Sequence, residues 1–123
     1  MNLKPSENAV LHGMSDYFNE IISLYKNQIM PTKILLSGKK GIGKSTMAYH
    51  VVNYILSDKE KFKYDLKTQT INIQNKSFKL IQNNTHPNFF LIDILNDKKN
   101  IDVTQVREMI SYTNKSTFNN MPR

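Results

Sequence analysis

Eight consecutive residues, Gly38 to Ser45, have the types and spacing needed to bind a polyphosphate. They read Gly-Lys-Lys-Gly-Ile-Gly-Lys-Ser, which fits the pattern G-x-x-x-x-G-K-S. The glycines let the backbone curl around phosphates with its N–H groups pointing inward. Lys44 would reach the β- and γ-phosphates, and the Ser45 hydroxyl would bind Mg²⁺. The pattern therefore predicts a site for a nucleoside triphosphate and its magnesium ion.

The elements on either side of this loop match the context that the motif requires. Residues 33–37 form a short apolar run of strand type, and residues 46–56 have the apolar spacing of a helix. A helix that begins near Gly43 would add its positive dipole end and unpaired N–H groups. The alternative is a glycine turn that precedes a core helix by chance. The match at the four fixed positions of the motif, together with a strand-type segment before it and a helical segment after it, disfavours this alternative. The residues expected at the site are Gly38, Lys39, Lys40, Gly41, Ile42, Gly43, Lys44, Ser45 and Thr46, with Thr46 toward the α-phosphate and Ser45 as the metal ligand.

The composition limits the broad class of the protein. The 123 residues suit one small domain, and the net charge of +7 suggests contact with nucleic acid. Lysine, asparagine and isoleucine account for 15, 15 and 13 residues, so a bias toward A/T-rich codons explains much of this charge equally well. The absence of cysteine excludes disulfides and cysteine-based zinc sites. No signal peptide or transmembrane run is apparent, and we expect a soluble, cytoplasmic protein without a membrane partner.

Four further elements are expected along the chain. A helix of about fifteen residues is expected from Ser15, which would cap it, with an apolar stripe from Phe18 to Ile29. Residues 57–70 are polar and predict a solvated loop or a frayed extension of the preceding helix. A second buried strand is expected at 89–95, followed by a helix capped by Asp102 that ends near Tyr112. The pattern at 71–81 fits a hairpin or a helical turn.

Three residues with chemically active side chains are candidates outside the loop. Asp93 follows four apolar residues, as a magnesium-binding Walker B aspartate does, but Ile94 stands where a second acidic residue is common. A plain core strand is the favoured interpretation of this segment. His12 is interpreted as a structural or surface residue. His50 is interpreted as a side position of its helix and a poor candidate for chemistry, because it lies a full turn beyond the phosphate loop.

Four stretches together give the chain a resemblance to a known family. They are Leu11-His12-Gly13, residues 33–49 around the phosphate loop, His86-Pro87-Asn88 with the apolar residues after it, and Ile101 to Ile110. In this order they resemble the N-terminal part of the bacterial DNA polymerase III clamp-loader subunits, especially the delta-prime subunit, of the AAA+ ATPase class. The loop alone is generic, whereas the ordered set is much more specific.

The resemblance implies an α/β fold, a P-loop NTPase of AAA+ type with a parallel sheet flanked by helices. Residues 1–123 would be the N-terminal part of that ATPase domain, cut before the Walker B strand. We therefore expect an incomplete sheet and low stability for the chain alone. It also implies ATP and Mg²⁺ as cofactors, with no catalytic residue inside these 123 residues.

The implied partners are other clamp-loader subunits in a hetero-oligomer and, through that complex, the sliding clamp and primed DNA. The gamma/tau ATPase subunit is the alternative within the family, favoured by the intact loop. The absent cysteines and the His86-Pro87-Asn88 segment favour delta-prime. Outside the family, a small P-loop kinase would need an arginine-rich or acidic lid, and only Arg107 and Arg123 are present. A non-catalytic interaction module is the third alternative.

Overall fold

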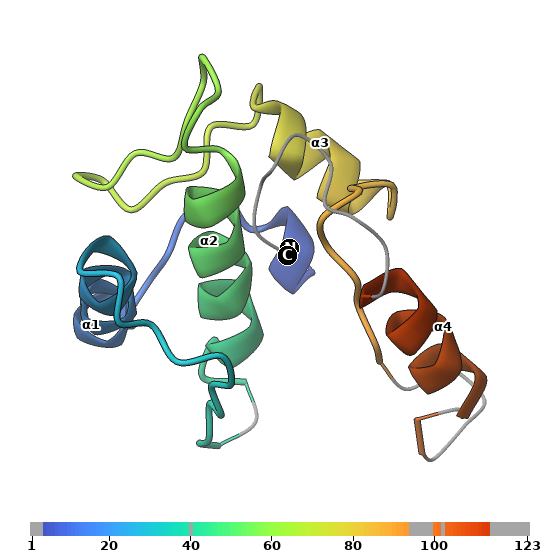
Figure 1. The fold of residues 1–123 in the computed structure, drawn as a ribbon. Helices are drawn as coiled ribbons and strands as arrows, with labels where there is room; N and C mark the ends of the chain where they lie inside the picture. The colour runs from blue at the N-terminus through green and yellow to red at the C-terminus, as the bar shows by residue number, and fades with distance from the viewer. Residues whose placement is uncertain (1–3, 40, 94–99, 102, 114–123) are drawn as a thin grey trace.

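The computed structural model of the chain describes residues 4–39, 41–93, 100–101 and 103–113. Its helical segments there are η1 (Pro5–Glu7), α1 (Ser15–Lys26), α2 (Lys44–Leu56), α3 (Lys76–Gln82) and α4 (Val103–Thr113). Helix α2 lies in the middle, with α1 on one side and η1 and α3 on the other (Figure 1). Helix α4 lies at the periphery (Figure 1). The fold is therefore organised around α2.

The two segments expected as strands have no regular structure in the described part of the chain. Residues 33–37 are extended between α1 and α2, and there Ile34 and Leu35 are 44% and 90% exposed. Residues 89–93 are likewise unassigned, and 94–95 lie outside the described residues. A strand forms only by pairing with another, and neither segment is paired here. The parallel sheet therefore stays a prediction.

Helix α1 follows the predicted apolar stripe but not the predicted cap. Phe18 and Ile22 are buried, whereas Ile29 lies beyond the helix end and is exposed. The expectation that Ser15 caps the helix is wrong. Ser15 is the first helical residue, and the N-cap position is held by Met14, with no side-chain hydrogen bond. The helix starts where Met14 enters the core, so burial rather than capping fixes its first turn.

Helix α2 buries polar side chains together with Met47, Val51 and Leu56. His50 and Asn53 are 0% and 1% exposed, so the expectation that His50 lies on the side of the helix is wrong. The His50 Nε2 lies 2.9 Å from the carbonyl oxygen of Asn8, which can only accept, so Nε2 donates. The His50 Nδ1 then accepts from the Tyr64 hydroxyl at 2.7 Å. Both nitrogens of a neutral imidazole are satisfied, which is what allows its burial.

The polar segment after α2 is only partly solvated. Tyr64 and Ile71 are 4% and 2% exposed and belong to the core with Phe18, whose ring centroid is 5.5 Å from that of Tyr64. The Tyr64 backbone N–H donates to the Ser57 hydroxyl at 3.1 Å. Antiparallel bridges connect Thr70 with Val10 and Asp65. The prediction of a solvated loop over 57–70 is therefore wrong for Tyr64, whose burial depends on partners distant in sequence.

Helix α3 decides between the two structures that the sequence allowed at 71–81. Asn75 caps it, accepting from the Phe78 N–H at 2.7 Å, and its amide also pairs with that of Asn53. The two amides exchange hydrogen bonds of 3.1 and 2.9 Å, and both side chains are 1% exposed. The Glu60 carboxylate accepts from the backbone N–H groups of Lys76 and Ser77. These contacts fix α3 against the end of α2.

Helix α4 confirms the helix predicted to end near Tyr112, but its apolar face is exposed. Val103, Val106 and Ile110 are 61%, 37% and 52% exposed. Contacts with residues 87–90 hold it, through the hydrogen bond from the Tyr112 hydroxyl to the Pro87 carbonyl and a 5.3 Å ring contact of Tyr112 with Phe90. Asp102, the expected cap, lies outside the described residues. None of the described helices has the length and apolar character needed to cross a bilayer.

The Asn53–Asn75 pair generates a stability prediction. Replacing Asn53 by Ala leaves the buried Asn75 amide without its partner, and we expect a loss of about 2–3 kcal/mol. Asn19→Ala is the control, because Asn19 is an exposed residue of α1 that accepts from Gln69, and it should cost below about 1 kcal/mol. Urea unfolding followed by circular dichroism measures both. In the double variant Asn53→Ala/Asn75→Ala the two losses should not add, and additive losses would contradict the pairing.

Burial of His50 predicts that stability falls with acidification. Burial lowers the pKa of His50 below its ordinary value of 6.5, with the Asn8 hydrogen bond partly opposing it. The unfolded chain then binds the proton more readily, so the free energy of unfolding falls as pH drops below about 6.5. His50→Gln should reduce this slope by up to about 1.4 kcal/mol per pH unit, whereas Asn19→Ala should keep it. Urea unfolding between pH 8 and 5 measures the slopes, and equal slopes in His50→Gln and wild type would refute the prediction.

Candidate phosphate-binding site

The phosphate loop folds back on itself at the N-terminus of α2. Lys44 is the first residue of that helix, and its Nζ donates to the Gly38 carbonyl oxygen at 2.5 Å. The lysine ammonium is thus held across the loop, from residue 44 back to residue 38. Eight of the nine expected site residues are described, and Lys40 lies outside the described residues.

The backbone geometry of this loop requires glycine at Gly43. Gly43 precedes α2 with φ of 101° and ψ of 18°, a left-handed conformation that disfavours side chains. A Cβ at Gly38 would lie 2.7 Å from the Ile42 Cδ1, the end of an exposed, flexible side chain that can move aside. The strict requirement for glycine is therefore at Gly43, where the backbone conformation itself disfavours a side chain.

The helix end beside the loop favours an anion. The first intrahelical bond runs from the Met47 N–H to the Gly43 carbonyl at 2.9 Å, which leaves the N–H groups of Lys44, Ser45 and Thr46 without helical partners. The first turn of α2 contains no acidic residue. The positive end of the helix dipole and the Lys44 ammonium therefore both contribute to a positive potential at this end of α2, and no acidic side chain in the first turn offsets it. Ser45 is exposed, and Lys44 and Thr46 are half-buried.

A cavity of about 430 Å³ lies beside Ser45. It is lined by Ser45, Tyr49, Val52, Phe89 and Asp93, among others. The ring centroids of Tyr49 and Phe89 are 5.9 Å apart, and burial, followed by the charge of Asp93, raises the pKa of Tyr49. Asp93 is thus brought to the same cavity as Ser45, although its placement does not decide between the two interpretations of its role.

Sequence reasoning left Tyr49 out of the site. Ser45 and Tyr49 are four residues apart on α2, and residues at this spacing share a helix face. This spacing in the sequence was enough to predict that Tyr49 lies on the same helix face as Ser45. Phe89 and Asp93 could be placed there only by the tertiary structure, since they lie more than 40 residues along the chain.

The expected donor set suits Mg²⁺ bound mainly through phosphate and water. Mg²⁺ in nucleotide sites keeps several waters and takes one or two protein oxygens, and the Ser45 hydroxyl fits that role. Among the described residues, no group of three or more His, Cys, Asp or Glu side chains is placed to hold a metal ion. Any ion at this site would therefore depend on the nucleotide for most of its ligands.

The His86-Pro87-Asn88 segment has a structural role in the described part of the chain. The His86 Nδ1 accepts from the Asn88 N–H at 3.0 Å, and its Nε2 lies 3.3 Å from the Ser77 hydroxyl of α3. Burial lowers the pKa of His86, with the nearby charge of Glu60 opposing it. The segment therefore joins α3 to the chain that runs on toward the cavity beside Ser45.

A protein-family model described as DNA polymerase III, delta subunit, matches residues 13–123. The match covers most of the chain, including the phosphate loop and the segments after it. The chain belongs to this DNA polymerase III delta subunit family. Searches among curated proteins and solved structures gave no match. The resemblance to clamp-loader subunits is thus confirmed at the level of the family, which connects the chain with the DNA polymerase III complex and DNA replication.

The backbone of Gly43 generates a prediction for the loop. Gly43→Ala should destabilise the protein by about 1–2 kcal/mol, because the left-handed conformation disfavours a Cβ. The new Cβ would lie 3.8 Å from the Met14 Cγ, an ordinary contact, so crowding adds little. Gly43→Asn is the matched comparison, since asparagine tolerates this conformation better, and it should cost less than alanine. Urea unfolding compares the two, and an equal or larger cost for asparagine would contradict the explanation.

Proposed function

We propose that the protein is an ATP-binding, delta-prime-like subunit of the DNA polymerase III clamp loader, acting in the cytoplasm in the loading of the sliding clamp onto primed DNA. Family membership supports the replication role, and the loop with Lys44 at the start of α2 supports the nucleotide site. The observation that carries the ATP assignment is the concentration of positive charge and N–H donors at one helix end.

The residues have distinct roles in this proposal. The backbone N–H groups from Gly41 to Thr46 bind the phosphate oxygens, and the Lys44 ammonium exchanges its bond with the Gly38 carbonyl for the β- and γ-phosphates. The Ser45 hydroxyl binds the Mg²⁺ that accompanies ATP. We propose that residues 33–37 and 89–95 are strands of the parallel AAA+ sheet, which would cover the exposed Ile34 and Leu35.

In this proposal the residues from Gly38 to Thr46 bind and orient ATP, and hydrolysis would need further groups. Water activation requires a positioned acidic or polar side chain and an arginine that stabilises the transition-state charge, which another subunit of the complex can supply. Other clamp-loader subunits are therefore the proposed partners. The gamma/tau subunit remains the second candidate, favoured by the unbroken G-x-x-x-x-G-K-S pattern.

Replacement of Lys44 tests the ATP site. Lys44→Ala should weaken the binding of ATP·Mg²⁺ by about ten- to a hundredfold, because charged hydrogen bonds to the phosphates are lost. Lys33→Ala is the control, since Lys33 is exposed and precedes the loop. Isothermal titration calorimetry measures the affinities, and circular dichroism checks that both variants stay folded. Equal affinity of Lys44→Ala and wild type would refute the assignment.

A further inference from the structure

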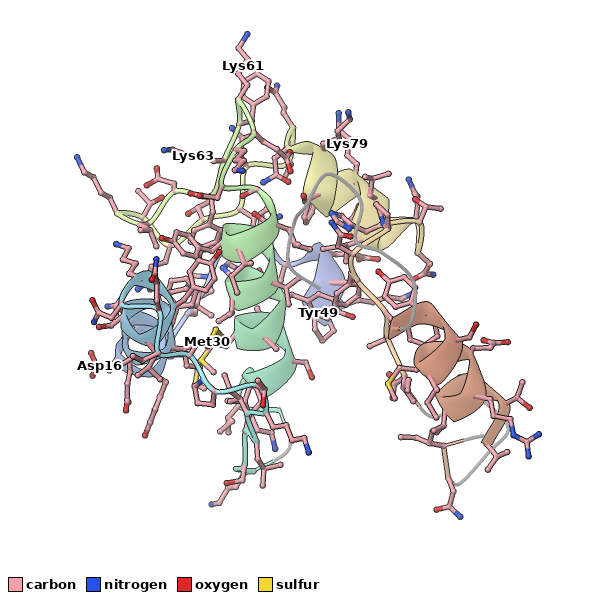
Figure 2. All side chains as sticks on the ribbon, viewed as in Figure 1. Asp16, Met30, Tyr49, Lys61, Lys63 and Lys79 are labelled. Carbon is pink, nitrogen blue, oxygen red and sulfur yellow. The ribbon has the colours of Figure 1, made fainter. Side chains whose placement is uncertain are left out.

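A surface rich in lysine lies at the opposite end of α2 from the phosphate loop. It consists of Lys59, Lys61, Lys63, Lys67, Lys76 and Lys79, all exposed, with the exposed ring of Phe62. In Figure 2, Lys61, Lys63 and Lys79 extend outward from the loop after α2 and from α3, away from the core. We call these six lysines and Phe62 the lysine surface.

The tip of this surface is anchored on both sides. The Glu60 carboxylate, just before the tip, accepts from the backbone N–H groups at the start of α3, and Tyr64, just after it, is buried in the core. Residues 61–63 therefore project from two fixed points. Phe62 is 38% exposed there, and the Lys61 ammonium lies 5.4 Å from the centre of its ring. A tip held in this way loses little conformational freedom on binding.

Two of the three carboxylates in this region accept hydrogen bonds from the backbone. Glu60 caps α3, and the Asp65 Oδ1 accepts from the N–H groups of Lys67 and Thr68 at 3.0 and 3.3 Å. The lysine side chains extend outward. Glu60 and Asp65 are thus engaged by the backbone and Asp58 is exposed, and six lysines against three carboxylates leave the region net positive.

We propose that the lysine surface binds single-stranded nucleic acid, with the lysines contacting successive phosphates and Phe62 stacking on a base. Lysines spread from Lys63 to Lys79 over two elements suit an extended polyanion better than a short acidic peptide (Figure 2). An exposed aromatic ring between lysines is the usual combination for unpaired bases, whose faces are open for stacking. A duplex offers no such faces. This site is separate from the phosphate loop and does not depend on ATP.

The test uses the full chain and a fluorescein-labelled oligothymidylate of about 20 nucleotides, without ATP or Mg²⁺. Fluorescence anisotropy gives the affinity at several salt concentrations between about 50 and 200 mM. Lys61→Gln should weaken binding about threefold at low salt and lower the salt slope by about 0.7. Lys33→Gln removes the same charge outside the lysine surface and should change both far less. Equal losses in the two variants would mean a general charge effect and would overturn the proposal.

Phe62 separates stacking from charge. Phe62→Leu should weaken binding about fivefold or more with the salt slope unchanged, and Phe62→Tyr should keep the affinity of wild type. An unlabelled duplex of the same length and a poly-glutamate peptide serve as competitors. If either displaces the oligothymidylate as well as unlabelled single strand does, or if Phe62→Leu binds like wild type, the proposal is wrong.

Discussion

The paired amides of Asn53 and Asn75 connect the helix that carries the phosphate loop with the segment that ends in α3. Two amides at 1% exposure are tolerated only because each donates to the other, and Asn75 also caps α3. An apolar pair could bury as much surface but would not specify which face of α3 meets α2. The hydrogen bonds fix that relation. The position of Glu60, Ser77 and the tip at 61–63 depends on it.

Positive charge lies near both ends of helix α2, for different reasons. At its N-terminus the positive potential comes from the helix dipole, the N–H groups without intrahelical partners and the Lys44 ammonium. Beyond its C-terminus the charge comes from lysines of the following loop and of α3, since the last turn of α2 itself contains no basic residue. The first arrangement suits a phosphate group at one point, and the second suits charge distributed along a chain. The two sites can therefore act independently.

The local part of this structure could be predicted from the sequence, and the long-range part could not. Apolar spacing was enough for α1, α2 and α4, and the glycine pattern was enough for the loop before α2. The burial of His50 and Tyr64 was not predictable, because it requires contacts between residues 14 to 42 positions apart. Asn75 illustrates the limit. Its capping role is local and visible at Asn75–Phe78, whereas its pairing with Asn53 has no local signal.

The site shows the same division between local and long-range information. The residues from Gly38 to Thr46 follow from spacing alone, but the aromatic cavity beside Ser45 requires Phe89 to return to α2. The strands of the expected sheet are the remaining long-range feature, and their partners determine whether Ile34 and Leu35 are covered. The bond from Lys44 to the Gly38 carbonyl is exposed, so exchanging it for a phosphate requires no change in the buried core. The loop can therefore bind an anion while the network around Asn53 stays unchanged.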